Sequence, residues 1–173
     1  RELISMRSAG YLHDLGKLSV PSAILDKPGK LDPHELAAIH GHTYHTFHIL
    51  ETVGGMTEIN EWASFHHERL DGNGYPFHHS AAQLTLGSRI MCVTDIFAAL
   101  TEDRPYRKAV GRDKVISILE KRAANNGLDG RIVETLVKDY DAICETCRAE
   151  QAVYLEKQRR LAEVMGSLEA APV

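Results

Sequence analysis

Tyr11-Leu12-His13-Asp14-Leu15-Gly16-Lys17 places an adjacent histidine and aspartate at the end of an apolar run. Leu12, Leu15 and Leu18 predict a buried helix wall, which the polar pair interrupts. A buried imidazole beside a buried carboxylate needs compensation, and a metal cation supplies it. The alternative is a His–Asp hydrogen bond that caps a helix. Neighbouring helical residues point about 100° apart, so such a pair seldom binds one metal by chance.

The composition limits the kinds of protein that could carry this His-Asp pair. A chain of 173 residues with 43% hydrophobic residues is long enough for one domain with a core. The net charge of -4 gives no reason to expect a nucleic-acid duplex as partner. No apolar run approaches the roughly 18 residues of a membrane segment, and Arg1-Glu2-Leu3-Ile4 opens a helical pattern with no signal peptide. Three cysteines make no disulfide framework, so we expect a cytoplasmic protein.

Hydrophobic periodicity predicts an all-α fold, because no window of period-two alternation is long enough for a strand. Asp32 reads as an N-cap and Pro33 as the first helical residue of a helix that continues to Gly54. Loops are expected over 16–30 and 71–76, and a short turn of helix over 81–84. The other expected helices span 2–12, 58–69, 87–102, 113–125 and 131–168.

The last of these helices carries a broken heptad pattern. Its apolar positions are Tyr140, Ile143, Cys147, Tyr154, Leu161, Val164 and Leu168. Such a seam could pair with a second copy of the chain, whereas the plainer interpretation is a helix whose second half frays. Cys144 and Cys147 form a C-x-x-C, but a zinc knuckle is unsupported without a second cysteine pair.

Polar residues that interrupt apolar helices form the candidate site. All ten histidines lie between His13 and His79, a clustering typical of metal chemistry. The candidates are His13, Asp14, His42, His66, His67 and Asp95. Four histidines and two carboxylates are too many for one open tetrahedral zinc site, and they suit two or more Fe or Mn ions with carboxylate bridges. The remaining histidines are expected on the surface: His34, His40, His45, His48, His78 and His79.

These motifs resemble the HD-GYP domain, a subgroup of the HD phosphohydrolase superfamily that hydrolyses cyclic di-GMP. The resemblance covers about residues 8 to 140 and includes Glu35, seven residues before His42. The matching segments are His13-Asp14-x-Gly16-Lys17, Ile24-Leu25-Asp26-Lys27-Pro28-Gly29-Lys30-Leu31, His66-His67-Glu68-Arg69-x-Asp71-Gly72-x-Gly74-Tyr75-Pro76, Arg89-Ile90 and Leu100-Thr101-x-x-Arg104-Pro105-Tyr106-Arg107.

The resemblance implies an HD-domain helical bundle over 1–140, followed by a helical extension over 141–173. It implies two or three divalent transition metals, Fe or Mn foremost and Zn, Ni or Mg as alternatives, held by the six candidate residues. Asp14 matches the carboxylate that bridges two metals, and Lys17 matches the lysine that reaches the scissile phosphate. Tyr75 and Pro76 match the loop that borders the substrate, and Arg104 and Arg107 match a basic pair on substrate phosphate. The planar guanidinium of arginine can donate two parallel hydrogen bonds to a phosphate, which agrees with this role.

The implied activity is hydrolysis of cyclic di-GMP by a metal-bridging hydroxide, giving the linear dinucleotide and, in some members, GMP. Glu68 and Arg69 are interpreted as residues that order the His66-His67 pair, with an exposed salt bridge as the alternative. The competing hypothesis is a weak or inactive module that binds a cyclic dinucleotide or a signalling protein. A different nucleotide hydrolase of the HD superfamily is disfavoured by the Gly72–Pro76 loop and by Arg104 to Arg107.

The sequence also departs from the family pattern. Members carry another histidine ligand on a helix before the His-Asp pair, and that helix is missing here, so we expect a fragment of a longer protein, with a sensor or receiver module upstream. Thr46 stands where many members have glycine, which predicts a tolerated packing change. Arg107 is lysine in some members, and Phe77-His78 replaces the usual Gly-Leu, which could alter the lip of the pocket.

Overall fold

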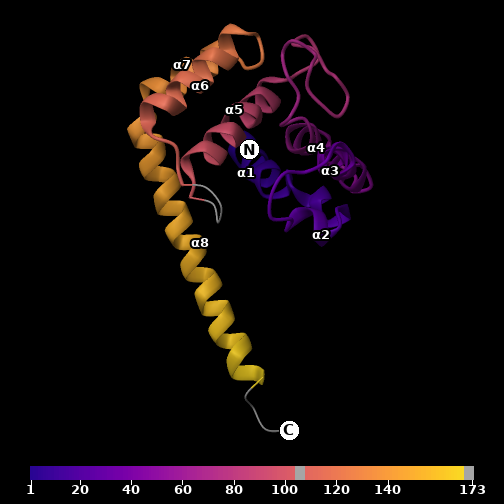
Figure 1. Ribbon diagram of the computed structural model, residues 1–173, viewed down its shortest axis with the longest axis vertical. Coiled ribbons are helices and arrows are strands. Elements are labelled where there is room, and N and C mark those ends of the chain that lie inside the picture. The colour runs from indigo at the N-terminus through magenta and orange to yellow at the C-terminus, as the bar shows by residue number, and fades with distance from the viewer. Residues whose placement is uncertain (104–107, 170–173) are drawn as a thin grey trace. The chain divides into compact units, whose positions relative to one another are not determined.

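The computed structural model describes residues 1–103 and 108–169. Within these ranges it contains helices and no strand, only an isolated antiparallel bridge between Asp71 and Ser80. The predicted all-α class is therefore confirmed. The elements are α1 (Glu2–Leu12), η1 (Leu15–Ser19, a 3-10 helix), α2 (Ser22–Leu25), α3 (Pro33–Glu51), α4 (Thr57–Ser64), α5 (Leu86–Thr101), α6 (Arg112–Ala124), α7 (Gly130–Lys138) and α8 (Tyr140–Glu169) (Figure 1).

The chain divides into two compact units, Arg1–Glu134 and Thr135–Val173. In the first unit α3 packs against η1 and α4, α1 packs against α4, and α5 packs against both α4 and α6. The core of these helices consists of Ala9, Leu50, Trp62, Ala63 and Met91. Every one of the four helices α1, α3, α4 and α5 contributes to it, so the core ties together the elements that carry the candidate site.

The start of α3 follows the sequence prediction. Asp32 accepts hydrogen bonds from the backbone N–H groups of His34 and Glu35, and the Glu35 carboxylate accepts the N–H of Asp32 in return. This capping box, with Pro33 at the first helical position, pairs backbone donors that have no partner within the helix. Lys27 donates to the same Glu35 at 2.6 and 2.7 Å, which anchors the preceding loop to the helix.

Several predicted boundaries were wrong. The segment 16–30 contains η1 and α2 in place of a continuous loop. Leu18 lies on η1 and is 83% exposed, so it is no part of a buried wall. The predicted helix over 58–69 ends at Ser64, and 81–84 is a hydrogen-bonded turn outside any helix. The chain between α4 and α5 is the long magenta loop of Figure 1.

The second unit consists of the end of α7 and the whole of α8. The single helix predicted over 131–168 is wrong, because the chain turns at Asp139, between α7 and α8. Aspartate has a low propensity for a helix interior, so breaking the helix at this residue costs little free energy. Along α8 the side chains of Tyr154, Leu161 and Val164 are more than half exposed. Dimerisation through this face stays a prediction.

No helix in the described ranges combines the length and apolarity that a bilayer crossing requires.

Candidate active site

The His13-Asp14 pair lies at a turn between two helices. His13 is the residue at which α1 ends, and Asp14 precedes η1. A Cβ at Gly16 would lie 1.9 Å from the His42 carbonyl oxygen, so only glycine lets η1 approach α3 this closely. The hydroxyl of Thr46 accepts the Gly16 N–H at 2.9 Å and donates to the His13 carbonyl at 3.2 Å. The helix α3 thus fixes the turn that presents His13 and Asp14.

Thr46 matters more than the sequence indicated. It is fully buried, and its hydroxyl is hydrogen-bonded at both ends to the turn it supports. We expected a packing change only, because the partners lie 30 and 33 residues away in the sequence.

Three of the four candidate histidines share one hydrogen-bond arrangement. The Nδ1 atoms of His13, His42 and His66 lie 2.6–2.7 Å from the carbonyl oxygens of Gly10, Ile39 and Ala63, in each case three residues earlier. A carbonyl can only accept, so Nδ1 carries the proton and Nε2 keeps its lone pair. Metal-binding histidines are commonly held in this way, because the outer hydrogen bond fixes both the tautomer and the ring orientation.

The Nε2 atoms and carboxylates converge. His42 Nε2 lies 3.4 Å from both His66 Nε2 and Asp14 Oδ1. His13 Nε2 lies 3.5 Å from Asp14 Oδ2 and 3.9 Å from Asp95 Oδ1. His67 Nδ1 lies 3.8 Å from the second oxygen of Asp95. The fold therefore brings all six candidate ligands together from the turn after α1, from α3 and α5, and from the loop after α4.

Two overlapping groups within this cluster have the geometry to hold a metal ion. One group is His42, His66 and His67, the other is His13, Asp14 and His66, and the ligand atoms of each lie within 4.8 Å of one another. Neighbouring histidine and carboxylate ligands suit Fe, Mn and other divalent transition metals. The donors present thus fit a centre of more than one ion.

The electrostatics of the cluster favour cation binding. Burial lowers the pKa of His42, lowers that of His66 far below its usual value, and brings that of His67 to about 3. Burial alone would raise the pKa of Asp14, but the hydrogen bond from Lys17 and the neighbouring His13 lower it overall. At neutral pH the imidazoles of His42, His66 and His67 are accordingly neutral, beside the ionised carboxylate of Asp14. Crowded lone pairs of this kind repel one another unless a cation lies between them.

Lys17 lies at the edge of this cluster. Its Nζ donates to Asp14 Oδ2 at 2.6 Å, and its side chain is 42% exposed. An exposed lysine next to the site can exchange this carboxylate for a phosphate oxygen of a ligand at little cost, because exposed ion pairs contribute only about 0–1 kcal/mol.

The glycine-rich loop after α4 is held by a buried carboxylate. Glu68, 1% exposed, accepts the backbone N–H groups of Phe77 and His79 at 2.7 and 3.0 Å. A Cβ at Gly74 would lie 2.4 Å from the Glu68 Cα, so glycine is required where the loop folds back. Glu68 thus orders the loop 71–80, whereas the sequence was interpreted to give it a role in ordering the His66-His67 pair.

The loop presents Tyr75 to the cluster. Its N–H donates to the His67 carbonyl at 3.2 Å, and its ring stacks on His40 with centroids 4.1 Å apart and planes inclined by 14°. Burial, together with the carboxylates of Asp95 and Asp14, raises the pKa of Tyr75, so the phenol stays protonated. The peptide bond between Tyr75 and Pro76 is cis.

Two of the histidines expected on the surface are half-buried. His40 stacks on Tyr75, and His79 lies against Phe65 with ring centroids 4.7 Å apart. The exposure predicted for His34, His45, His48 and His78 is confirmed. Arg104 and Arg107, the predicted phosphate pair, lie outside the described residues.

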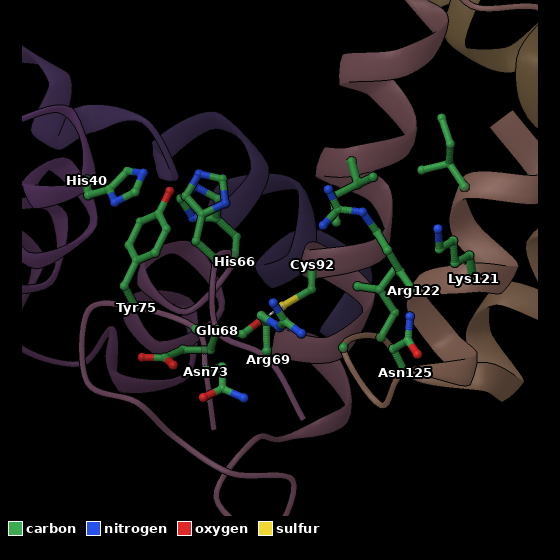
Figure 2. A pocket seen from close by; sticks show the side chains of 16 residues that line it. His40, His66, Glu68, Arg69, Asn73, Tyr75, Cys92, Lys121, Arg122 and Asn125 are labelled. Atoms are coloured by element: carbon green, nitrogen blue, oxygen red, sulfur yellow. Dashed lines mark hydrogen bonds between the residues drawn. The ribbon is translucent and has the colours of Figure 1, made fainter. Parts of the chain in front are cut away.

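A cavity of about 720 Å³ adjoins the cluster (Figure 2). His66 and His67 line it on one side, with His40 and Tyr75 beside them, and Lys121 and Arg122 of α6 line it on another. A second opening, of about 460 Å³, is lined by His13, Asp14, Lys17 and Asp95 among others. Cavities of roughly 300–1,000 Å³ take small-molecule ligands.

Comparison with known proteins places these features in a family. The model of the HD domain family matches residues 1–132. A 3'3'-cGAMP-specific phosphodiesterase of Vibrio cholerae is 40% identical over 130 residues, which are 75% of this chain and 30% of the relative. A cyclic di-GMP phosphodiesterase of Pseudomonas aeruginosa is 36% identical over 131 residues, 75% of this chain and 31% of the relative.

A third relative, a cyclic di-GMP phosphodiesterase response regulator of Xanthomonas campestris, is 31% identical over 153 residues. The match covers 84% of this chain and 39% of the relative. The chain thus spans well under half the length of these curated relatives.

Proposed function

The chain belongs to the HD domain family, with motifs of HD-GYP type, and we propose that it is a metal-dependent phosphodiesterase of cyclic dinucleotides. The observation that carries the proposal is the convergence of four imidazoles and two carboxylates beside a cavity bordered by Tyr75. Relatives named as cyclic di-GMP and 3'3'-cGAMP phosphodiesterases support this substrate class.

In this proposal His13, Asp14, His42, His66, His67 and Asp95 hold two or three divalent metals. When bound, the metals supply Lewis acidity toward the phosphate and lower the pKa of a water molecule that attacks phosphorus. Fe and Mn suit the mixed histidine and carboxylate donors best, while Zn, Ni and Mg remain alternatives.

The protein's own residues position the substrate. Asp14 lies between the histidines of both ligand groups, which suits a bridging carboxylate. Lys17 exchanges Asp14 for a phosphoryl oxygen, and its charge stabilises the negative charge that develops there. Tyr75 and Pro76 border the substrate and exclude water on the loop side, and Arg104 and Arg107 take a substrate phosphate through bidentate hydrogen bonds. The product is the linear dinucleotide, with further cleavage to GMP as a second step.

The cellular setting is part of the same proposal. Cys92, Cys144 and Cys147 form no disulfide with one another, which supports a reducing compartment, the cytoplasm. The proposed arrangement places a sensor or receiver module upstream of the chain and a second copy against α8.

The deciding experiment combines elemental analysis of the protein with turnover of cyclic di-GMP under anaerobic conditions. We expect at least two transition-metal ions per chain, and hydrolysis that His66→Ala and Asp95→Ala abolish. His34→Ala is the matched control, because His34 is an exposed histidine at the start of α3, eight residues before His42. Full activity in either cluster variant would overturn the proposal. Binding of cyclic di-GMP without turnover in the metal-loaded protein would establish the competing hypothesis of a non-catalytic module.

A further inference from the structure

A buried thiol on α5 contacts the turn that carries two of the candidate metal ligands. Cys92 is 5% exposed, and its sulfur lies 3.3 Å from the backbone carbonyl oxygens of both Phe65 and Glu68. These two residues flank His66 and His67 in the chain. Figure 2 shows the sulfur pointing from α5 toward the segment that carries Glu68. The thiol therefore contacts the turn at both of its ends.

The turn itself is a single hydrogen-bonded loop of four residues. The Glu68 N–H donates to the Phe65 carbonyl at 2.9 Å, at the point where α4 has just ended. Carbonyl groups at the end of a helix have no partner within the helix, and a buried one needs a donor from elsewhere in the protein. Among the described residues, the Cys92 thiol is the one hydrogen-bond donor to the Glu68 carbonyl. The thiol thus satisfies the last carbonyl of the turn.

The glycine-rich loop packs against the same peptide group. A Cβ at Gly74 would lie 2.4 Å from the Glu68 Cα and 2.6 Å from its carbonyl carbon. The loop backbone therefore touches the Glu68 backbone directly, while the Cys92 sulfur contacts the carbonyl oxygen. Contacts from the loop and from α5 together leave this end of the turn little freedom to shift.

The helix that carries the thiol also supplies a candidate ligand. Cys92 and Asp95 lie three positions apart on α5, so their side chains share one face of that helix. One carboxylate oxygen of Asp95 lies 3.8 Å from His67 Nδ1. The helix α5 therefore meets the turn twice, through the thiol at its backbone and through the carboxylate at one of its imidazoles.

The thiol keeps its proton throughout the physiological range. Burial raises the pKa of Cys92 to about 12, and the carboxylates of Asp95 and Glu68 add to the increase. A protonated thiol is a weak hydrogen-bond donor and a poor nucleophile. Its contribution is therefore a fixed contact and not a chemical reaction.

Building on the function proposed above, we infer that Cys92 is a positioning residue of the metal centre, which acts through His66 and His67. By holding both ends of the turn against α5, the thiol sets the separation between the two imidazoles and Asp95. Groups that orient metal ligands are known to change the affinity for the metal by about 10- to 100-fold when they are substituted. Cys92 orients its ligands through their backbone, whereas the carbonyl groups described above orient the imidazole rings.

The first test measures metal binding without substrate. Manganese(II) is titrated under anaerobic conditions into metal-free protein, and the free ion is followed by electron paramagnetic resonance. Cys92→Ala is expected to weaken binding by about tenfold, because the turn loses its contact with α5. Cys144→Ala is the matched control and should bind as the wild type does, because Cys144 is a second buried cysteine on α8, a helix that carries none of the candidate ligands. Equal affinities in the two variants would overturn the inference.

The second test separates the hydrogen bond from packing. Cys92→Ser restores a hydrogen-bond donor at nearly the same side-chain volume as Cys92→Ala, so it should recover most of the affinity for manganese. Urea denaturation in excess EDTA measures what each substitution costs the fold when no metal is bound. If Cys92→Ser binds manganese as weakly as Cys92→Ala, the thiol only fills space in the core, and the positioning role is wrong.

The third test distinguishes a positioning residue from one that touches the substrate, because Cys92 also lines the cavity of about 720 Å³. At saturating manganese, Cys92→Ala should lower kcat for cyclic di-GMP and leave KM nearly unchanged, since the thiol acts on the metal ligands. A raised KM, with kcat and manganese affinity unchanged, would assign Cys92 to substrate contact and contradict the inference.

These measurements also separate the inference from the proposed function. Manganese binding that depends on Cys92, in a protein that does not hydrolyse cyclic dinucleotides, would remove the enzyme and keep the positioning role. Metal binding and hydrolysis that are both indifferent to Cys92 would do the reverse. Wild-type protein that binds no manganese would overturn both.

Discussion

The side-chain carboxylate of Glu68 accepts the backbone N–H of Phe77 at 2.7 Å, from nine residues earlier in the chain. With the second bond, to the N–H of His79, it spans the loop that carries Tyr75. A carboxylate this deeply buried is stable only because both oxygens are hydrogen-bonded. The shape of the loop, and with it one border of the cavity, depends on a carboxylate whose two oxygens are bonded to the loop backbone.

Glu68→Gln should therefore destabilise the protein. A glutamine amide offers one oxygen and one NH2 group, so one backbone N–H would face a donor. We expect a loss of about 2–3 kcal/mol in the free energy of unfolding, measured by urea denaturation. Glu58→Gln, at an exposed glutamate in the first turn of α4, should change it by less than about 0.5 kcal/mol. Similar losses in both variants would contradict this role.

Gly16→Ala tests the close approach of η1 to α3. The new methyl group would overlap the His42 carbonyl oxygen, which belongs to the backbone and cannot rotate away. We expect a loss of about 3 kcal/mol or more, together with reduced metal content by elemental analysis. Gly10→Ala should have the opposite sign, a gain of up to about 1 kcal/mol, since its position in α1 has nothing within 4 Å.

Thr46→Val keeps the shape of the side chain and removes the hydroxyl. The Gly16 N–H then loses its acceptor in a buried position. Thermal denaturation should report a loss of about 1–2 kcal/mol, and metal affinity should fall about tenfold because the turn carrying His13 and Asp14 loosens. Thr52→Val is the control, because Thr52 is exposed and its hydroxyl donates to the Ile49 carbonyl within the same turn. Neither the stability nor the metal affinity should change appreciably in this variant.

Glu68, Gly16 and Thr46 make contacts that the sequence alone did not predict. The start of α3 was predictable because its caps are local: Asp32, Pro33 and Glu35 lie within four positions of one another. The six candidate ligands could be listed because polar residues in apolar helices stand out. The bonds of Thr46 and Glu68 could not be inferred, because their partners are backbone groups, which leave no signal in the side-chain pattern.

The end of α4 was missed for a related reason. We extended that helix through His66 and His67, although adjacent helical side chains diverge by about 100°. The structure ends α4 at Ser64, and the following turn brings both imidazoles to one cluster with ring centroids 4.1 Å apart. A continuous helix would have pointed the two rings in different directions, although the helical pattern of the sequence looked regular through His67.

The acid stability of the protein should depend on Asp129. Burial alone would raise the pKa of this carboxyl, but the hydrogen bond from Arg89 and the backbone N–H of Arg131 lower it overall. A lowered pKa means that the ion pair stabilises the fold above the unfolded pKa near 4, and that this contribution is lost as pH falls through the folded value. Asp129→Asn should thus cost about 1 kcal/mol at pH 7 and nothing once wild-type Asp129 is protonated. A cost that is the same at every pH would contradict the assignment.

The carbonyl-anchored imidazoles of His13, His42 and His66 have a consequence for how the centre is filled. Their orientation is settled when the chain folds, so an arriving ion meets donors that already point inward, with little entropy left to lose. Any selection among divalent ions then rests on the geometry of these fixed donors and of the carboxylates beside them, because the imidazoles do not have to rearrange.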